Sequence, residues 1–468
     1  MMCSFLGATL APMPRAMSVA TPLAAETRRL LALAWPVMLT SLNWTILHVT
    51  DVVVVGLAGT HQVAALGASR TITFPGIVMG LGALTGILVH VSRADGAGDL
   101  RQTGRVLHEG LLLALLLGVA SMAILMGFAA PLLAGVGVAP ELVSATAPVV
   151  QVMALAYPFQ LVTIATSFFL EGVSRPARVT VVNLAVLPIN GLLAWLLATG
   201  AWGFPALGAI GAAAATAIAS AFGAIGMLAA AWTLPRAEAR GVRLLGDWGR
   251  AETWRGAWAL ARFGMVPAIA SGLELVGFSI LIALSTQLGE NTAHAFQIVF
   301  SIHNVTFAVA LGLGSAAGVR VGNAVGEGVP QAAGSRAGIA AGLAALATGL
   351  LALALIFMPM LVVARFPAPA DVHALAATML LLWAPFILFD GVQVVFVYAL
   401  RSLGDQVAAG INGILAFFVV TGGLGLWLVQ AGWGAQALVL ASGLGMVAAA
   451  LLDGARLRVV TRRVRSRS

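Results

Sequence analysis

Long apolar segments recur along the whole chain, and they constrain its fold more than any other feature of the sequence. A helix needs about 20 apolar residues to cross the hydrocarbon core of a bilayer. Runs of that length are predicted at 31–58, 63–90, 106–138, 144–170, 179–200, 206–233, 260–286, 292–318, 337–364, 372–398, 408–430 and 434–459. Only 9% of the residues are charged and the mean hydropathy is +1.01, which excludes a soluble globular domain. The sequence therefore predicts an all-α membrane protein with twelve transmembrane helices.

The arginines lie mainly between these segments and are distributed unevenly between the two sides of the membrane. If both termini share a side, that side receives Arg28, Arg29, Arg93, Arg101, Arg105, Arg175, Arg178, Arg336, Arg401, the arginines of 236–262 and the C-terminal tail. The other side receives Arg365 alone. The positive-inside rule then predicts cytoplasmic termini, in a bacterial inner membrane. The net charge of +8 reflects this topology, so no nucleic-acid partner is expected.

The two halves of the chain resemble each other. The stretch 89–105 aligns with 319–335 at an offset of 230, and the same offset relates Gly59 to Gly289 and Gly82 to Gly312. Six spans per repeat give both lobes the same orientation, related by an axis along the membrane normal. We predict an N-terminal tail at 1–25, a first lobe at 26–233, a cytoplasmic linker at 234–258, a second lobe at 259–459 and a basic tail at 460–468.

Two shorter segments have alternative interpretations. Residues 1–25 contain an apolar run without a basic region before it, so a cleaved signal peptide is not expected. In the linker, Trp254 and Trp258 lie beside Arg250 and Arg255. This pattern suits a helix at the level of the lipid headgroups, and a solvated connection between the lobes is the alternative.

Few ionisable side chains fall inside the predicted spans, and each of them needs an explanation. They are Asp51 and His48 in span 1, Arg70 in span 2, Glu274 in span 7, His303 in span 8 and Asp390 in span 10. A central aspartate costs about 2.5–3.5 kcal/mol on insertion scales, so such a group faces a partner or a water-filled cavity. The three carboxylates are therefore the leading functional candidates.

In the first lobe, Asp51 and Arg70 lie at similar depths in consecutive spans. We expect them to meet, either as a permanent bridge between helices or as a pair that opens when a proton or cation binds. His48 shares a helix face with Asp51 at a spacing of three residues. It either tunes that carboxylate and relays a proton, or hydrogen bonds to a neighbouring helix. The same two interpretations apply to His303.

In the second lobe, Glu274 lies seven residues after Pro267, as Asn43 lies seven after Pro36. The repeat thus places a polar side chain at one level in both lobes. Asp390 and Gln393 are three residues apart on one helix and can point into one cavity. Burial favours the neutral form of a carboxyl, whereas a nearby cation favours the charged form. A carboxyl between these influences can exchange a proton or sodium ion for an organic cation, and helix association through protonated carboxyls is the alternative.

With these residues in place, the chain resembles the multidrug and toxic compound extrusion (MATE) family from about residue 30 to 455. The segments that carry the resemblance are WPVMLTSLNWTILHVTDVVVVGLAG, the DGAG and GEG loops, EGVSRP, LPIN, GFPALGAIGAAAAT, VPAIASGLELVGF, GVRVGNAVGEG and FDGVQVVFVYALRSLGD. The resemblance implies two six-helix bundles in a V, and export of organic cations or drugs in exchange for protons or sodium.

The resemblance also implies site residues. The matching positions are Asp51 in span 1, Asn190 in span 5, Thr216 in span 6, Glu274 in span 7 and Asp390 in span 10. Many members have an aspartate or asparagine one turn after the span 5 asparagine, where this chain has Ala194. We expect supporting roles for Asn190, Thr216, Arg70, Asn43, Gln393 and His48. The coupling ion would be H+ or Na+, with Na+ at Asp51 or at Glu274 and Asp390. We expect a monomer whose only partners are small organic cations and membrane lipids, and which needs no cofactor.

Other functions fit the sequence less well. Flippases of the related lipid-linked oligosaccharide exporters often have several cationic side chains in the cleft, whereas this chain has Arg70. An intramembrane enzyme would need a nucleophile, base or metal cluster, and the sequence has no HExxH, GxSxG or paired aspartates on adjacent spans. The sequence contains no repeated selectivity-filter motif that would indicate a channel. No Walker A motif occurs, so an ion gradient is the expected energy source.

Overall fold

The computed structural model describes residues 23–243 and 250–467, so most of the predicted tail 1–25 and part of the linker lie outside the described residues. The first lobe comprises α1 (Leu23–Gly56), α2 (Thr60–Gly96), α3 (Leu100–Gly135), α4 (Pro140–Ala154), α5 (Tyr157–Gly172), α6 (Pro176–Thr199), η1 (Ala201–Gly203) and α7 (Gly208–Trp232). After α8 (Ala237–Arg240), the second lobe comprises α9 (Ala251–Gln287), α10 (Glu290–Gly326), η3 (Pro330–Ala332), α11 (Ala333–Phe357), α12 (Pro359–Val363), α13 (Ala370–Trp383), η4 (Ala384–Phe386), α14 (Ile387–Ser402), α15 (Gln406–Gly413), the π-helix η5 (Ile414–Leu424), α16 (Gly425–Gln430) and α17 (Ala435–Arg467).

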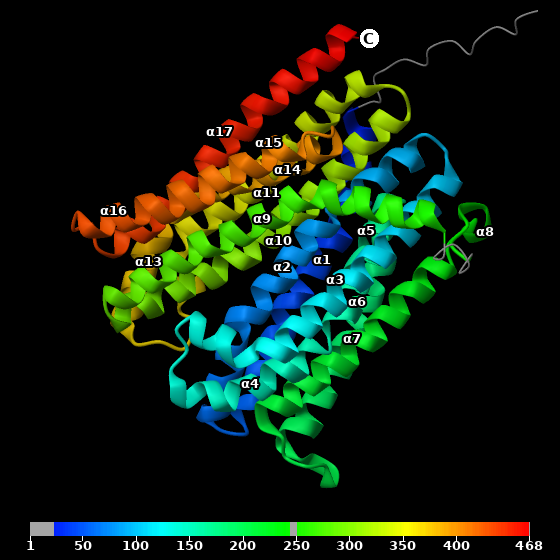
Figure 1. The fold of residues 1–468 in the computed structure, drawn as a ribbon. Coiled ribbons are helices and arrows are strands. Elements are labelled where there is room, and N and C mark those ends of the chain that lie inside the picture. Colours follow the sequence, from blue (N-terminus) through cyan, green and yellow to red (C-terminus); the bar gives the residue numbers. More distant parts are fainter. Residues whose placement is uncertain (1–22, 244–249, 468) are drawn as a thin grey trace, which may run out of the picture.

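The helices confirm the predicted all-α membrane architecture (Figure 1). Eleven of those in the described ranges are long and apolar enough to cross a membrane, and the number is twelve when the bent pair α4 and α5 forms one span. Helices suit this environment because they satisfy every backbone hydrogen bond internally, where lipid offers none. The chain is therefore an integral, multi-pass membrane protein.

Proline interrupts equivalent spans in the two lobes. The fourth span bends by 46° between α4 and α5, just before Pro158. The tenth span is broken by η4, which contains Pro385. A proline lacks the N–H that its position in a helix requires and its ring crowds the preceding turn. Pro36, Pro188 and Pro267 lie inside the continuous helices α1, α6 and α9.

The predicted repeat has a direct structural counterpart in α2 and α10. Both helices have 37 residues, and their bounds differ by the offset of 230. Gly59 and Gly289 precede them with φ of 118° and 110°, a conformation that favours glycine. The two glycines therefore form equivalent turns, as the sequence alignment required.

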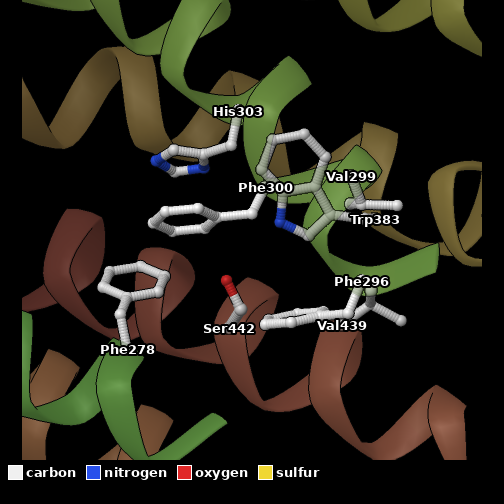
Figure 2. A pocket seen from close by; sticks show the side chains of 8 residues that line it. All are labelled: Phe278, Phe296, Val299, Phe300, His303, Trp383, Val439 and Ser442. Carbon is white, nitrogen blue, oxygen red and sulfur yellow. The ribbon is translucent and has the colours of Figure 1, made fainter. Parts of the chain in front are cut away.

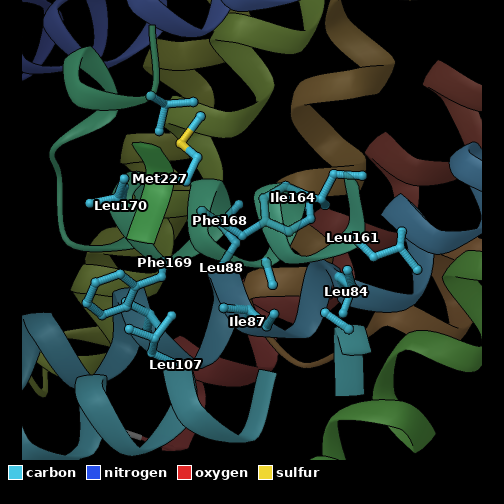
Figure 3. Close-up of a cluster of buried hydrophobic side chains, with 14 of the residues drawn as sticks. Leu84, Ile87, Leu88, Leu107, Leu161, Ile164, Phe168, Phe169, Leu170 and Met227 are labelled. Carbon is cyan, nitrogen blue, oxygen red and sulfur yellow. The ribbon is translucent and has the colours of Figure 1, made fainter. Parts of the chain in front are cut away.

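We call the end of the molecule where α1 begins and α17 ends the terminal face, and the other end the distal face. One buried apolar cluster includes side chains of both lobes, among them Leu84 and Leu88 of α2 and Leu313 of α10, and it also extends along α3 to Leu133 in the distal half of the first lobe. Figure 3 shows the first-lobe part of this cluster around α2, α3 and α5. Two further clusters in the distal half each contain side chains of one lobe only. The lobes are thus joined at the terminal face and separate towards the distal face.

Close backbone approach at glycines and hydrogen bonds from side chains hold the two lobes together near the terminal face. Glycines permit the close approach of the lobes, because a side chain at Gly96 would collide with the backbone of Asn323, and one at Gly326 with the backbone of Arg93. These contacts are equivalent under the repeat, which places a two-fold axis between α2 and α10. The hydrogen bonds that cross between the lobes here run from Arg320 to Glu26, from Asn323 to the carbonyl of Ser92, from Arg93 to the carbonyl of Ser402 and from Ser315 to Glu171.

The segment that connects the lobes is not one uniform linker. Its first part packs on the first lobe, where the ring of His108 lies 3.1 Å from the carbonyl oxygen of Gly241. Its last part is helical, because α9 begins at Ala251, eight residues before the predicted start of the second lobe. Trp254 and Trp258 belong to this first part of α9 and are 50% and 68% exposed.

Candidate functional site

In the first lobe, α1, α2 and α6 bring three predicted residues together. The side-chain amide of Asn190 donates to one carboxylate oxygen of Asp51 at 2.9 Å. The guanidinium of Arg70 lies 3.4 Å from the other oxygen, and at the same distance from the main-chain carbonyl of His48. Asp51 is 3% exposed at its side chain, so both of its oxygens have protein partners in a buried place. The Asp51 carboxylate is therefore already paired with a cation of the chain itself.

Three further predicted residues of this lobe have other partners. Thr216 donates to the carbonyl of Ala212 in its own helix. Asn43 donates to the carbonyl of Asn183 on α6. The ring of His48 packs edge-on against aromatic rings of α1 and α2. The side-chain contacts of these residues are therefore with helix backbones or aromatic rings, and not with the Asp51 carboxylate.

In the second lobe, the side chains of Asp390 and Gln393 are both buried and contact each other on α14. Asp390 lies one turn after η4, is 3% exposed, and accepts a hydrogen bond from Gln393 at 3.3 Å. Glu274 of α9 is close enough to Asp390 for their charges to interact. Within the described ranges, neither carboxyl forms an ion pair with an arginine side chain. Two neighbouring carboxyls without such a pair can share a proton or hold a cation.

The sequence analysis missed the role of Arg401. It was assigned to the positively charged side of the membrane, but its charge interacts with Glu274 and Asp453 inside the second lobe. The guanidinium lies 5.8 Å from the centre of the Tyr398 ring. A signal was present in the sequence, because Arg401 follows Asp390 by three helical turns in the segment FDGVQVVFVYALRSLGD. The sequence alone did not show that Glu274 lies close to Arg401, because the two residues are far apart in the chain.

His303 is part of an aromatic cluster in the distal half of the second lobe (Figure 2). Its ring stacks on Phe300 at 5.9 Å and on Phe307 at 5.7 Å, and lies 5.1 Å from Trp383. The sequence left open a proton relay or a hydrogen bond to a neighbouring helix, whereas the contacts of this ring within the described residues are with other aromatic rings. The adjoining cavity measures about 10 Å³, roughly the space of one water molecule. An organic molecule does not fit there.

The two lobes differ in how well their residues fit a sodium ion. At Asp51, Arg70 already supplies the positive charge, and a second cation would have to displace it. At Glu274 and Asp390, two carboxyls and the Gln393 amide supply the oxygen donors that hard cations prefer. No group of three or more His, Cys, Asp or Glu side chains gathers in the described chain. Any cation at the second site would thus rely on carboxyls together with amide, backbone or water oxygens.

Comparison with known proteins gives a consistent result. The MatE family model matches residues 36–196 and 267–423, one match in each lobe. The chain is 32% identical over 428 residues to a probable multidrug resistance protein NorM of Bradyrhizobium diazoefficiens, covering 87% of this chain and 90% of the relative. A protein with the same description from Deinococcus radiodurans is 33% identical over 436 residues, covering 91% and 94%.

Solved structures share the fold at lower sequence identity. The eukaryotic MATE transporter AtDTX14 superposes with a TM-score of 0.84 at 18% identity, covering 95% of this chain and 99% of that one. A multidrug resistance MATE family transporter in an outward-facing conformation gives 0.81 at 18% identity, covering 93% and 96%. The agreement extends over both lobes.

Proposed function

Because the chain belongs to the MATE family of transporters, we propose that it exports organic cations or drugs in exchange for protons or sodium. Family membership also means that the chain is not an enzyme, as the sequence analysis expected. Curated relatives carry the description of multidrug resistance proteins, which supports drugs as the substrate class. The energy source would be an ion gradient.

The observation that carries the proposal is the difference between the carboxyls inside the spans of the two lobes. Asp51 has a guanidinium 3.4 Å away, whereas Glu274 and Asp390 interact with each other, and Arg401 interacts with Glu274 without forming an ion pair. We therefore place the exchange of coupling ion and substrate at Glu274 and Asp390. The pair of Asp51 and Arg70 then holds α1 against α2. In this mechanism a bound proton or sodium ion leaves the second-lobe carboxyls as the organic cation arrives, because one negative site cannot hold both.

The arrangement of the lobes supports alternating access. We place both termini in the cytoplasm, by the positive-inside rule, and the protein in the bacterial inner membrane. The terminal face is then cytoplasmic, and the lobes are joined there by a common core and by hydrogen bonds. The separate distal cores correspond to a state open to the outside. Rocking of the lobes about the two-fold axis would expose the same site to the cytoplasm.

The test is efflux of a cationic dye from proteoliposomes under separate pH and sodium gradients. We expect Glu274→Gln and Asp390→Asn to lose gradient-driven efflux, since each removes a titratable group from the exchange site. The matched control is Glu290→Gln, which removes an exposed carboxyl at the distal start of α10. Wild-type efflux in both interior variants would contradict the proposal, as would equal losses in the control.

A further inference from the structure

A cavity on the terminal face of the first lobe belongs to neither carboxyl site. It measures about 450 Å³ and lies where the end of α2, the α5–α6 connection and the segment after α7 meet. The short α8 marks this corner in Figure 1. Its lining residues are Asp95, Val173, Ser174, Arg175, Leu234, Pro235, Arg236 and Arg240.

The cavity has an excess of positive charge. Its one carboxylate, Asp95, pairs with Arg240 at 2.8 Å, and Arg240 also donates to Thr103. Arg175 and Arg236 remain, and within residues 23–243 and 250–467 their side chains form no hydrogen bond or ion pair. Two guanidinium groups therefore line the cavity without a counter-charge from the described chain.

Two neighbouring arginines, by contrast, have protein acceptors. Arg178 donates to the carbonyls of Ala230 and Thr233, and thereby caps the end of α7. Arg243 forms an ion pair with Glu238 at 2.7 Å. Both of these side chains lie outside the cavity lining and have protein acceptors. Arg175 and Arg236 differ from these two neighbours, because their exposed guanidinium groups line the cavity and have no such acceptor within the described residues.

The backbone of the cavity is also unusual. Ser174 and Arg236 both have φ of 60°, in the left-handed region where glycine is favoured. At Ser174 this conformation ends α5, and the amide of Arg175 then donates to the carbonyl of Leu170. Side chains at such positions cost conformational free energy. The turns nonetheless carry a hydroxyl and a guanidinium on the cavity wall.

The position of the cavity relative to the membrane surface indicates where its ligand comes from. Trp232, the last residue of α7, is 41% exposed, and the guanidinium of Arg243 lies 5.9 Å from its ring. Tryptophan side chains favour the membrane–water interface. The part of the lining that follows α7 begins two positions after Trp232, at Leu234, which places the cavity at the level of the lipid headgroups.

We propose that this cavity binds a phosphate group through Arg175 and Arg236. Guanidinium groups match phosphate oxygens in charge and geometry, and basic pockets on the cytoplasmic side of transporters accept phosphate headgroups. The phosphate comes either from an anionic lipid of the adjacent leaflet or from a soluble phosphate. The site is separate from the proposed exchange site, so binding is measured without transport.

The test uses the delipidated full-length protein in a neutral detergent and native mass spectrometry. The probes are phosphatidylglycerol, phosphatidylcholine and inorganic phosphate. We expect phosphatidylglycerol to bind more tightly than phosphatidylcholine, and the variant Arg175→Gln with Arg236→Gln to weaken its binding about 30-fold. That value follows from roughly a fivefold contribution by each basic side chain near an anionic headgroup.

The control variant removes the same charge from the same face. Arg458→Gln with Arg462→Gln changes two exposed arginines of α17, and we expect lipid binding to stay at the wild-type level. Displacement of the lipid by inorganic phosphate would assign a soluble source, and failure of displacement a lipid source. Equal effects of the two double variants, or equal binding of the two lipids, would overturn the proposal. Retained dye efflux in each variant shows that it folds.

Discussion

Removing the carboxylate of Glu26 should shift the balance between the two arrangements of the lobes. Glu26 lies near the start of α1 in the first lobe, and Arg320 lies near the end of α10 in the second. The guanidinium donates to both carboxylate oxygens, at 2.6 and 2.8 Å. The side chains are 0% and 8% exposed, so water does not replace either partner while the lobes are joined. Glu26→Gln leaves Arg320 buried without its charge partner.

The size of the effect follows from this geometry. Removing one partner of a buried ion pair costs about 3–5 kcal/mol. Arg320 keeps the side-chain oxygen of Asn323 as an acceptor at 3.3 Å, so the lower value of about 3 kcal/mol applies. When the lobes separate at the terminal face, water reaches Arg320 and the penalty disappears. The equilibrium between the arrangements should therefore shift by about 150-fold, at 1.4 kcal/mol for each factor of ten.

The assay is a distance measurement between spin labels on the two lobes. The chain has one cysteine, so Cys3→Ser gives a background for Leu57→Cys and Gln287→Cys, which place labels on exposed distal residues of each lobe. We expect Glu26→Gln to move the population from long distal distances to short ones.

The control for this experiment breaks an exposed ion pair. Glu238→Gln removes the partner of Arg243, where the side chains are 80% and 40% exposed, and such surface pairs contribute about 0–1 kcal/mol. Identical distance distributions for wild type, Glu26→Gln and Glu238→Gln would refute the assignment of the Glu26 pair as a contact that stabilises the joined terminal face.

Three further experiments test other parts of the structure. Asn190→Ala leaves a buried Asp51 oxygen without its donor, so we expect about 1–3 kcal/mol of destabilisation, measured as a lower melting temperature in detergent. If the Asp51 pair is structural, Arg70→Asp should abolish efflux, and combining it with Asp51→Arg should restore it; failure of the combination would return a coupling role to Asp51. Gly326→Ala places a methyl group against the backbone of α2 and should disfavour joined lobes in the spin-label assay, whereas Gly338→Ala, with open space around it, should leave the distances unchanged.

Much of the architecture was predictable because the bilayer restricts what a sequence can do. Apolar length gave twelve spans, and the spacing of glycines gave the repeat that α2 and α10 display. Spans break before Pro158 and at Pro385, whereas Pro36 and Pro267 lie inside continuous helices. Neighbouring helices decide whether a proline bends a span, and a single sequence does not describe those neighbours.

The candidate site was predictable only in part. Burial of a charge in lipid is expensive, so the sequence alone identified Asp51, Glu274 and Asp390 as residues that need a partner or a cavity. The depth of Arg70 also predicted its meeting with Asp51. The interaction of Arg401 with Glu274 was not predictable, because it depends on where the fold places two residues that are far apart in the chain.

The sequence by itself determined the fold class, the number of spans and the residues that carry unavoidable charge, since all three follow from the cost of placing polar groups in hydrocarbon. Only the tertiary structure decided which of those charges meet, which half of the interface is joined, and where two arginines line a cavity without a partner. These properties depend on contacts between residues far apart in the chain, and helical periodicity carries no information about such contacts.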